Sequence, residues 1–353
     1  MYTKYKYSLR EVLVWTRLEI LWLFLLASVY TALYELAGWH WMEIPWTPLA
    51  MVGTAVAFLI GFQNNAAYGR AWEARKIWGS IVNESRTFAM MTHELITDEH
   101  ATESISRDQL SQHRTRLIRR HIAWLTALRH AMRIKKSWEV FSEHRTSREW
   151  YEKVVLPERD TSVKEELRPL LGESEYEQVV DRTNHAVAIL SLQFKDIREL
   201  KRQGLIWEFS FLEFHNVIRE LVALQGKSER IKNFPYPRQF ATIGHDLVRV
   251  FILLLPLGIV PQFSRLGVEL AEANPMIDGY FVWLSVPLVA IVAWVFHTML
   301  RIGTSGENPF EGSANDVPIS TIARGIEIDL REMNGEPGSE IPDPLPTVHN
   351  VQM

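Results

Sequence analysis

The chain has 353 residues and a net charge of −4 at pH 7, with 38 Lys and Arg against 42 Asp and Glu. Because there is no basic excess, no nucleic-acid partner is expected. The absence of cysteine excludes disulfides, a thiol nucleophile and cysteine-ligated zinc.

Four apolar segments are predicted to cross a membrane. They cover about residues 14–37, 46–68, 240–263 and 279–300, and a long charged block separates the second from the third. A spanning helix needs about 20 predominantly apolar residues, and many of the 13 tryptophans lie in or beside these segments, as they do at membrane boundaries. We therefore expect an all-α, multi-pass protein with four transmembrane helices in a lipid bilayer.

The second segment is the most informative, because residues 44–69 carry no charge. Residues four apart share one helix face, and two such stripes run side by side: Gly53, Ala57 and Gly61, and Thr54, Phe58 and Phe62. The small stripe would let another helix approach closely. The bulkier stripe would suit the wall of a narrow apolar pore, which can gate by expelling water. Plain packing of the rings is the alternative.

The polar run that follows, Gln63, Asn64 and Asn65, also permits two interpretations. It would suit the wet side of an apolar constriction. It would equally suit ordinary hydrogen bonding between helices.

Charge bias predicts the orientation of the helices. Positive residues flank one set of helix ends: Lys4, Lys6, Arg10, Arg70, Arg75, Lys76, Arg238 and Arg301. The opposite loops, about 37–47 and 265–279, contain Arg265 against Glu43, Glu269, Glu272 and Asp278. The positive-inside rule then places both termini and the central block in the cytoplasm.

The central block, about 70–237, is predicted to be helical, because apolar residues recur at helical spacing and breakers are few. The chain after Gly335 contains four prolines and is predicted to be an extended peptide, ordered only against a partner subunit.

No motif for catalysis or for a bound cofactor is found, so we expect neither an enzyme nor a cofactor. The histidines lack zinc-site spacing. The stretch from Glu307 to Asp316 is rich in oxygen ligands that calcium prefers. Asn-Pro and Asn-Asp also form turns, and a turn is the favoured interpretation.

Taken together, the motifs resemble the bestrophin family, closest to its bacterial branch, over about residues 5–320. The resemblance rests on the runs 58–73, 78–79, 83–86, 204–206, 229–237 and 307–310. It implies a homopentameric ion channel in a bacterial inner membrane that passes monovalent ions. Its implied parts are residues 1–69 with the first two membrane helices and the neck, a cytosolic helical domain at 70–238, membrane helices three and four at 239–301, and a C-terminal segment wrapping the vestibule at 302–353.

The resemblance also implies roles for individual residues. Thr54, Phe58 and Phe62 match the three neck positions, and Phe209 beside Glu208 matches a second constriction, the cytosolic aperture. Asn308 and Asp316 remain from the calcium clasp of the animal members, which are calcium-activated anion channels. Since the run of aspartates is replaced by Ser313-Ala314-Asn315-Asp316, we expect calcium binding to be weak or absent.

Selectivity for monovalent cations is expected, because a negative pore mouth concentrates cations. Glu43, Glu269, Glu272 and Asp278 would give a negative outer rim, and Glu208 would give an inner acidic ring. The bacterial branch also resembles cation channels. The alternatives are an anion (chloride) channel of the same family, or a multi-pass transporter or scaffold.

Overall fold

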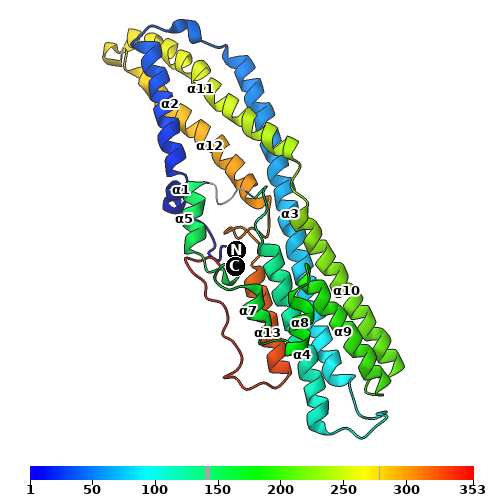
Figure 1. The fold of residues 1–353 in the computed structure, drawn as a ribbon. Helices are drawn as coiled ribbons and strands as arrows, with labels where there is room; N and C mark the ends of the chain where they lie inside the picture. The colour runs from blue at the N-terminus through cyan, green and yellow to red at the C-terminus, as the bar shows by residue number, and fades with distance from the viewer. Residues whose placement is uncertain (140–143, 278) are drawn as a thin grey trace.

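The computed structural model describes residues 1–139, 144–277 and 279–353, and these residues form helices and connecting loops without a β-strand. The molecule is elongated, with long apolar helices gathered at one end and a second bundle at the other (Figure 1). The prediction of an all-α protein is confirmed.

Four helical stretches are long and apolar enough to span a membrane: Arg17–Glu35, Trp46–Glu94, Glu208–Ala273 and Phe281–Gly306. They contain α2 (Arg17–Glu35), α3 (Trp46–Glu94), α10 (Glu208–Asn233) with α11 (Arg238–Ala273), and η4 (Phe281–Leu284) with α12 (Ser285–Gly306). Each of the four predicted segments corresponds to one of them. A short helix, α1 (Leu9–Trp15), precedes them and starts with a capping box at Ser8.

The second predicted segment is only the first part of a longer helix. We predicted membrane residues 46–68, and α3 continues without a break for 49 residues. Its only proline, Pro48, lies in the first turn, where proline is tolerated, so nothing later in α3 interrupts the hydrogen-bond ladder. One helix therefore connects the membrane end to the second bundle.

The membrane helices pack on a shared apolar core. Its fully or nearly fully buried members come from α2, α3, α11 and α12 and include Leu23, Val56, Phe251 and Val289. Gly53 permits a close approach of α11 to α3, because a Cβ there would lie 2.8 Å from the Phe251 ring. A Cβ at Gly61 would meet no atom within 4 Å, so this part of the small stripe stays open in the subunit.

The second bundle is built around the second half of α3. It consists of α4 (Arg107–Arg133), α9 (His185–Arg202), α10 and α13 (Ile319–Met333), with the short helices α5 (Arg145–Lys153), α6 (Pro157–Asp160), α7 (Val163–Leu167) and α8 (Glu173–Val180) around it. Its core contains fully buried Trp78, Phe88, Trp124 and Phe214. Burial lowers the pKa of His121 to about 3, so this histidine is a neutral core residue that bonds Ser85 at 2.9 Å.

Two 3₁₀ turns, η1 (His40–Met42) and η3 (Pro275–Ile277), lie in the connections opposite the bundle. The chain after Gly335 is non-helical, as predicted. Val351 and Met353 pack with Val154 and Leu156, and the Thr3 amide donates to the Asn350 carbonyl at 2.8 Å. The two chain ends therefore meet (Figure 1).

Gly204 shapes the turn between α9 and α10. Its φ is +74°, and a Cβ there would lie 2.1 Å from the His100 carbonyl oxygen. The Leu205 amide donates to the Leu200 carbonyl at 2.9 Å, and the Thr97 amide donates to the Leu205 carbonyl at 3.0 Å. Only glycine combines this left-handed backbone with so close a neighbour.

We expect Gly204→Ala to lower the free energy of unfolding by about 2 kcal/mol or more, because it adds a left-handed penalty to a backbone clash. Thermal unfolding of the full chain in detergent measures the change. Gly226→Ala is the matched control, because it lies inside α10 with no atom within 4 Å and should stabilise the helix by roughly 0.5–1 kcal/mol. Equal melting temperatures for the two variants would contradict this interpretation of the turn.

Candidate functional site

The membrane half of α3 has one packed face and one open face. Its packed face includes Val56 and Ile60, which are 2% and 3% exposed. On the other face Phe58 and Phe62 are 65% and 70% exposed, and Thr54 is also exposed. The three predicted neck residues therefore lie together on a face that the subunit itself leaves uncovered.

The open face continues along α3 into the half of the helix that lies in the second bundle. Lys76 follows Phe58 by 18 residues (76 − 58), which is five turns at 3.6 residues per turn, so the two share one face. Asn65, Gly69 and Trp72 lie between them within about 40° of that direction, and all are exposed. A single exposed stripe therefore runs along α3 from the aromatic ring of Phe58 to the basic side chain of Lys76.

The structure separates the three polar residues below Phe62. Gln63 is 5% exposed and donates from Nε2 to Glu307 Oε1 at 2.9 Å. Asn64 donates from Nδ2 to the Met299 carbonyl at 3.2 Å. Both make hydrogen bonds to α12 or to the loop after it. These two residues therefore fit the alternative of ordinary hydrogen bonding between helices. Only Asn65 shares the open face with the rings.

Arg70 forms a junction that the sequence did not reveal. Its Nε donates to the Glu307 carbonyl at 2.9 Å, and its Nη2 donates to the carbonyls of Ile231 and Phe234 at 3.2 and 2.8 Å. These carbonyls lie at the C-terminal ends of α12 and α10, where helices leave carbonyls without partners. One guanidinium therefore caps two helices, and a cation is favoured there by the helix dipoles.

The carboxylate in this junction is unusual. Glu307 is 2% exposed, and burial raises its pKa although Gln63, Arg238 and Arg70 oppose the shift. A nearby pair, Arg230 Nη2 with Glu73 Oε1 at 2.5 Å, fixes α10 against α3. The sequence carried only one signal for this site, the position of Arg70 at the end of the uncharged run, which we interpreted as a marker of orientation.

The predicted aperture residues lie at the start of α10. Phe209 is 68% exposed and touches Trp207 edge to face at a centroid distance of 5.5 Å. Glu208 is paired with Lys201, at 2.7 Å between Oε2 and Nζ, so its charge is compensated. The turn at Gly204 holds both residues at the end of α10 that is far from the membrane helices (Figure 1).

The acidic outer rim is also partly compensated. Glu43 forms an ion pair with Arg265 and accepts a hydrogen bond from the Tyr34 hydroxyl at 2.6 Å. Glu269 and Glu272 are exposed. Asp278, which contributed to the predicted rim, lies outside the described residues.

The loop after α12 is a turn built around Asp316. One carboxylate oxygen of Asp316 accepts from the Gly312 amide and the other from the Ser313 hydroxyl, and Arg133 lies 3.9 Å away. Burial raises the pKa of Asp316, against the opposing effect of Arg133 and these hydrogen bonds. Asn308 donates to Glu311 Oε2 at 3.3 Å. The two residues that remain from the calcium clasp are therefore engaged within their own loop.

The helices are those of a multi-pass membrane protein. Its longest helix, α3, carries an exposed aromatic stripe that its own subunit does not cover. Residues 9–332 match the bacterial and fungal bestrophin family. The chain belongs to that family, and the resemblance predicted from the motifs is confirmed.

Named relatives are similar over most of their length. A voltage-dependent anion channel-forming protein of Ralstonia nicotianae is 26% identical over 302 residues, covering 84% of this chain and 81% of that protein. The voltage-dependent anion channel-forming protein YneE of Escherichia coli K12 is 25% identical over 345 residues, covering 95% and 93%. The crystal structure of a bestrophin homolog from Klebsiella pneumoniae has a TM-score of 0.71 at 21% identity, covering 91% and 98%, and shares the fold.

We expect calcium titration by calorimetry to give no micromolar isotherm, because affinity follows the number of free carboxylate ligands. Asp316→Ala should lower the melting temperature equally with and without calcium, since it leaves the Ser313 hydroxyl and Gly312 amide without their acceptor, at a cost of about 1–3 kcal/mol. A saturable micromolar isotherm that Asp316→Ala abolishes would contradict this interpretation of the loop.

Proposed function

We propose that five copies of this chain form an ion channel in a bacterial inner membrane, with α3 of each copy lining the axis. The observation that carries the proposal is the open face of α3, where Thr54, Phe58 and Phe62 are exposed while the opposite face is packed. Membership of the bestrophin family supports it. The positive-inside rule supports a cytoplasmic location for both termini and the bundle.

Phe58 and Phe62 are the proposed neck. Rings from five subunits would form a narrow apolar constriction, which opposes ion passage because water leaves it. Lipid contact is the competing explanation for exposed rings on a membrane helix. The open surface at Gly61 on a neighbouring face favours a subunit contact, because small residues let helices approach closely.

Phe58→Ala and Phe62→Ala should each raise single-channel conductance by about tenfold, the change that a barrier lower by about 1.4 kcal/mol produces. Planar-bilayer recording measures it. Phe240→Ala is the matched control, because Phe240 is 64% exposed on α11 and should face lipid. Native mass spectrometry in mild detergent should give five copies for every variant. A stable monomer or dimer would contradict the proposed pentamer. Unchanged conductance in both variants would contradict the assignment of Phe58 and Phe62 to the neck.

For selectivity, we propose that the channel conducts anions. The named relatives are described as anion channel-forming proteins, which favours the anion alternative over the expected cation selectivity. Of the acids on which the cation argument relied, Glu43 and Glu208 are paired with cations of the chain, whereas Glu269 and Glu272 are exposed. The field at the inner mouth must therefore come from other residues.

Lys76 is the best candidate for that field. It is exposed on the same helix face as Phe58, and within the described chain it forms no ion pair. In a pentamer built around α3, five ammonium groups would form a ring about 27 Å below Phe58, at 1.5 Å per residue. Such a basic ring concentrates anions at the inner mouth.

We expect a reversal potential near the chloride equilibrium potential in asymmetric potassium chloride. Lys76→Glu should shift it toward potassium, because the ring changes sign. Arg75→Gln is the matched control: the residue is exposed on the same helix but lies about 100° away around the axis, and its loss should leave the potential nearly unchanged. A parental value near the potassium potential would overturn anion selectivity, and equal shifts in both variants would exclude Lys76 as the source.

A further inference from the structure

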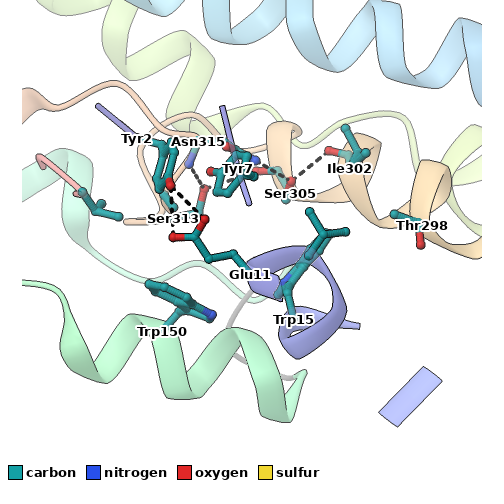
Figure 2. Close-up of a pocket in the computed structure, with 13 residues that line it drawn as sticks. Tyr2, Tyr7, Glu11, Trp15, Trp150, Thr298, Ile302, Ser305, Ser313 and Asn315 are labelled. Atoms are coloured by element: carbon teal, nitrogen blue, oxygen red, sulfur yellow. Dashed lines mark hydrogen bonds between the residues drawn. The ribbon is translucent and has the colours of Figure 1, made fainter. Parts of the chain in front are cut away.

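A cavity of about 180 Å³ lies where the N-terminal segment, α1, α5, the end of α12 and the loop after it meet. Its wall includes Tyr2, Tyr7, Glu11, Trp15, Trp150 and Thr298 (Figure 2). An apolar cavity of about 150 Å³ accepts benzene in another protein, so this volume fits a single ring or a short chain. The open face of α3 contributes no residue to the wall.

Glu11 is the only residue of the cavity wall that carries a formal charge at pH 7. Its Oε2 accepts from the Ser8 amide at 2.7 Å and the Ser8 hydroxyl at 2.8 Å, which forms the capping box of α1. These bonds lower the pKa of Glu11, so the group is ionised at neutral pH. Its Oε1 has a single hydrogen bond, from the Tyr2 hydroxyl at 3.2 Å, and has room for another donor.

Aromatic rings surround this carboxylate. In Figure 2 the Glu11 side chain extends toward Tyr2, with Trp150 and Trp15 on its other sides. Tyr2 stacks on Tyr7 at a centroid distance of 3.9 Å, and both rings line the cavity. Rings around an anionic group attract alkylammonium ions, because the face of an aromatic ring is negative.

The rest of the cavity wall is mixed. Val12 and Ile302 contribute apolar surface, and Ser305, Ser313 and Asn315 contribute polar atoms. Thr298 also lines the cavity, but its Oγ1 is inaccessible to solvent, so the hydroxyl is not available to a ligand.

We propose that this cavity is a binding site for a small hydrophobic ammonium ion, with the ammonium between Glu11 and the rings and the apolar body toward Ile302. A neutral ligand would leave the remaining acceptor capacity of Glu11 Oε1 unused. An anionic ligand would face a carboxylate at short range, and like charges repel. The site lies beyond the ion pathway proposed above and does not depend on it.

Some cations of the chain itself lie near the cavity. Lys4 Nζ is 3.9 Å from Glu11 Oε1, and its side chain is 54% exposed, so it is a weak internal competitor for the same oxygen. Arg301 lies 4.2 Å from the Trp15 ring, and its charge is balanced by Glu19. Lys153, 5.9 Å from the Trp150 ring, is exposed to solvent.

The test is fluorine NMR of 4-fluorobenzylammonium with the full chain in nanodiscs of phosphatidylglycerol. Saturable binding is expected, with an affinity about tenfold above that of neutral 4-fluorobenzyl alcohol, because the ammonium gains a charge-assisted hydrogen bond and ring contacts. Protein-free nanodiscs correct for partition into lipid.

Glu11→Gln should reduce the ammonium affinity to that of the alcohol. Glutamine also serves at this position of a capping box, so α1 is retained. Glu165→Gln is the matched control, because Glu165 forms the same box with Ser162 at the start of α7, away from the cavity. Trp150→Leu should weaken the ammonium more than the alcohol, and Lys4→Met should strengthen it several-fold. Equal affinities of parent and Glu11→Gln for the ammonium, or equal affinities of parent for the ammonium and the alcohol, would overturn the proposal.

The ammonium could come from a free amine or from an ethanolamine lipid headgroup. Repeating the titration in nanodiscs that contain phosphatidylethanolamine separates the two sources. Weaker apparent binding of the probe identifies the lipid as a competitor for the site. Unchanged binding identifies a free amine.

Discussion

The junction around Arg70 is the interaction on which the arrangement of the two halves depends. A guanidinium has five donors in a fixed plane, and here three of its hydrogen bonds go to carbonyls at the ends of α10 and α12. Both helices end next to α3, at the level where the uncharged run stops. Without Arg70 these carbonyls would lose their partners at a partly buried site, which is costly. One side chain of α3, Arg70, thereby binds both a membrane helix and a helix of the bundle.

Gln63 extends the same junction by about two turns of α3 toward the rings. Its hydrogen bond to buried Glu307 places the loop after α12 directly behind the proposed neck, since Gln63 follows Phe62 in sequence but lies about 100° around the helix. One face of α3 is thus occupied by polar contacts within the subunit, and the face with the rings is left open. The membrane part of α3 therefore has one packed and one open face because its polar residues form hydrogen bonds on one side of the helix.

The features that depend on local sequence could be predicted, and those that depend on distant partners could not. Uncharged length and helical spacing identified four membrane segments and the stripe of Phe58 and Phe62. The sequence could not show which of Gln63, Asn64 and Asn65 contacts α12. Successive residues point about 100° apart around a helix, and the direction in which α3 faces α12 is known only from the fold. Neither could the sequence show that Glu43 is paired with Arg265, 222 positions away.

The pairing of acidic residues has a general consequence for selectivity arguments. A formal charge counted from sequence contributes to the field at a pore mouth only if no opposite charge lies beside it, because a close pair acts as a dipole whose potential decays quickly. Glu208 beside Lys201 is such a pair, whereas Lys76 stands exposed on the stripe that begins at the rings. The basic inner mouth that we propose therefore relies on a residue that the count of charges had treated only as a marker of orientation, and the difference arises from contacts rather than from composition.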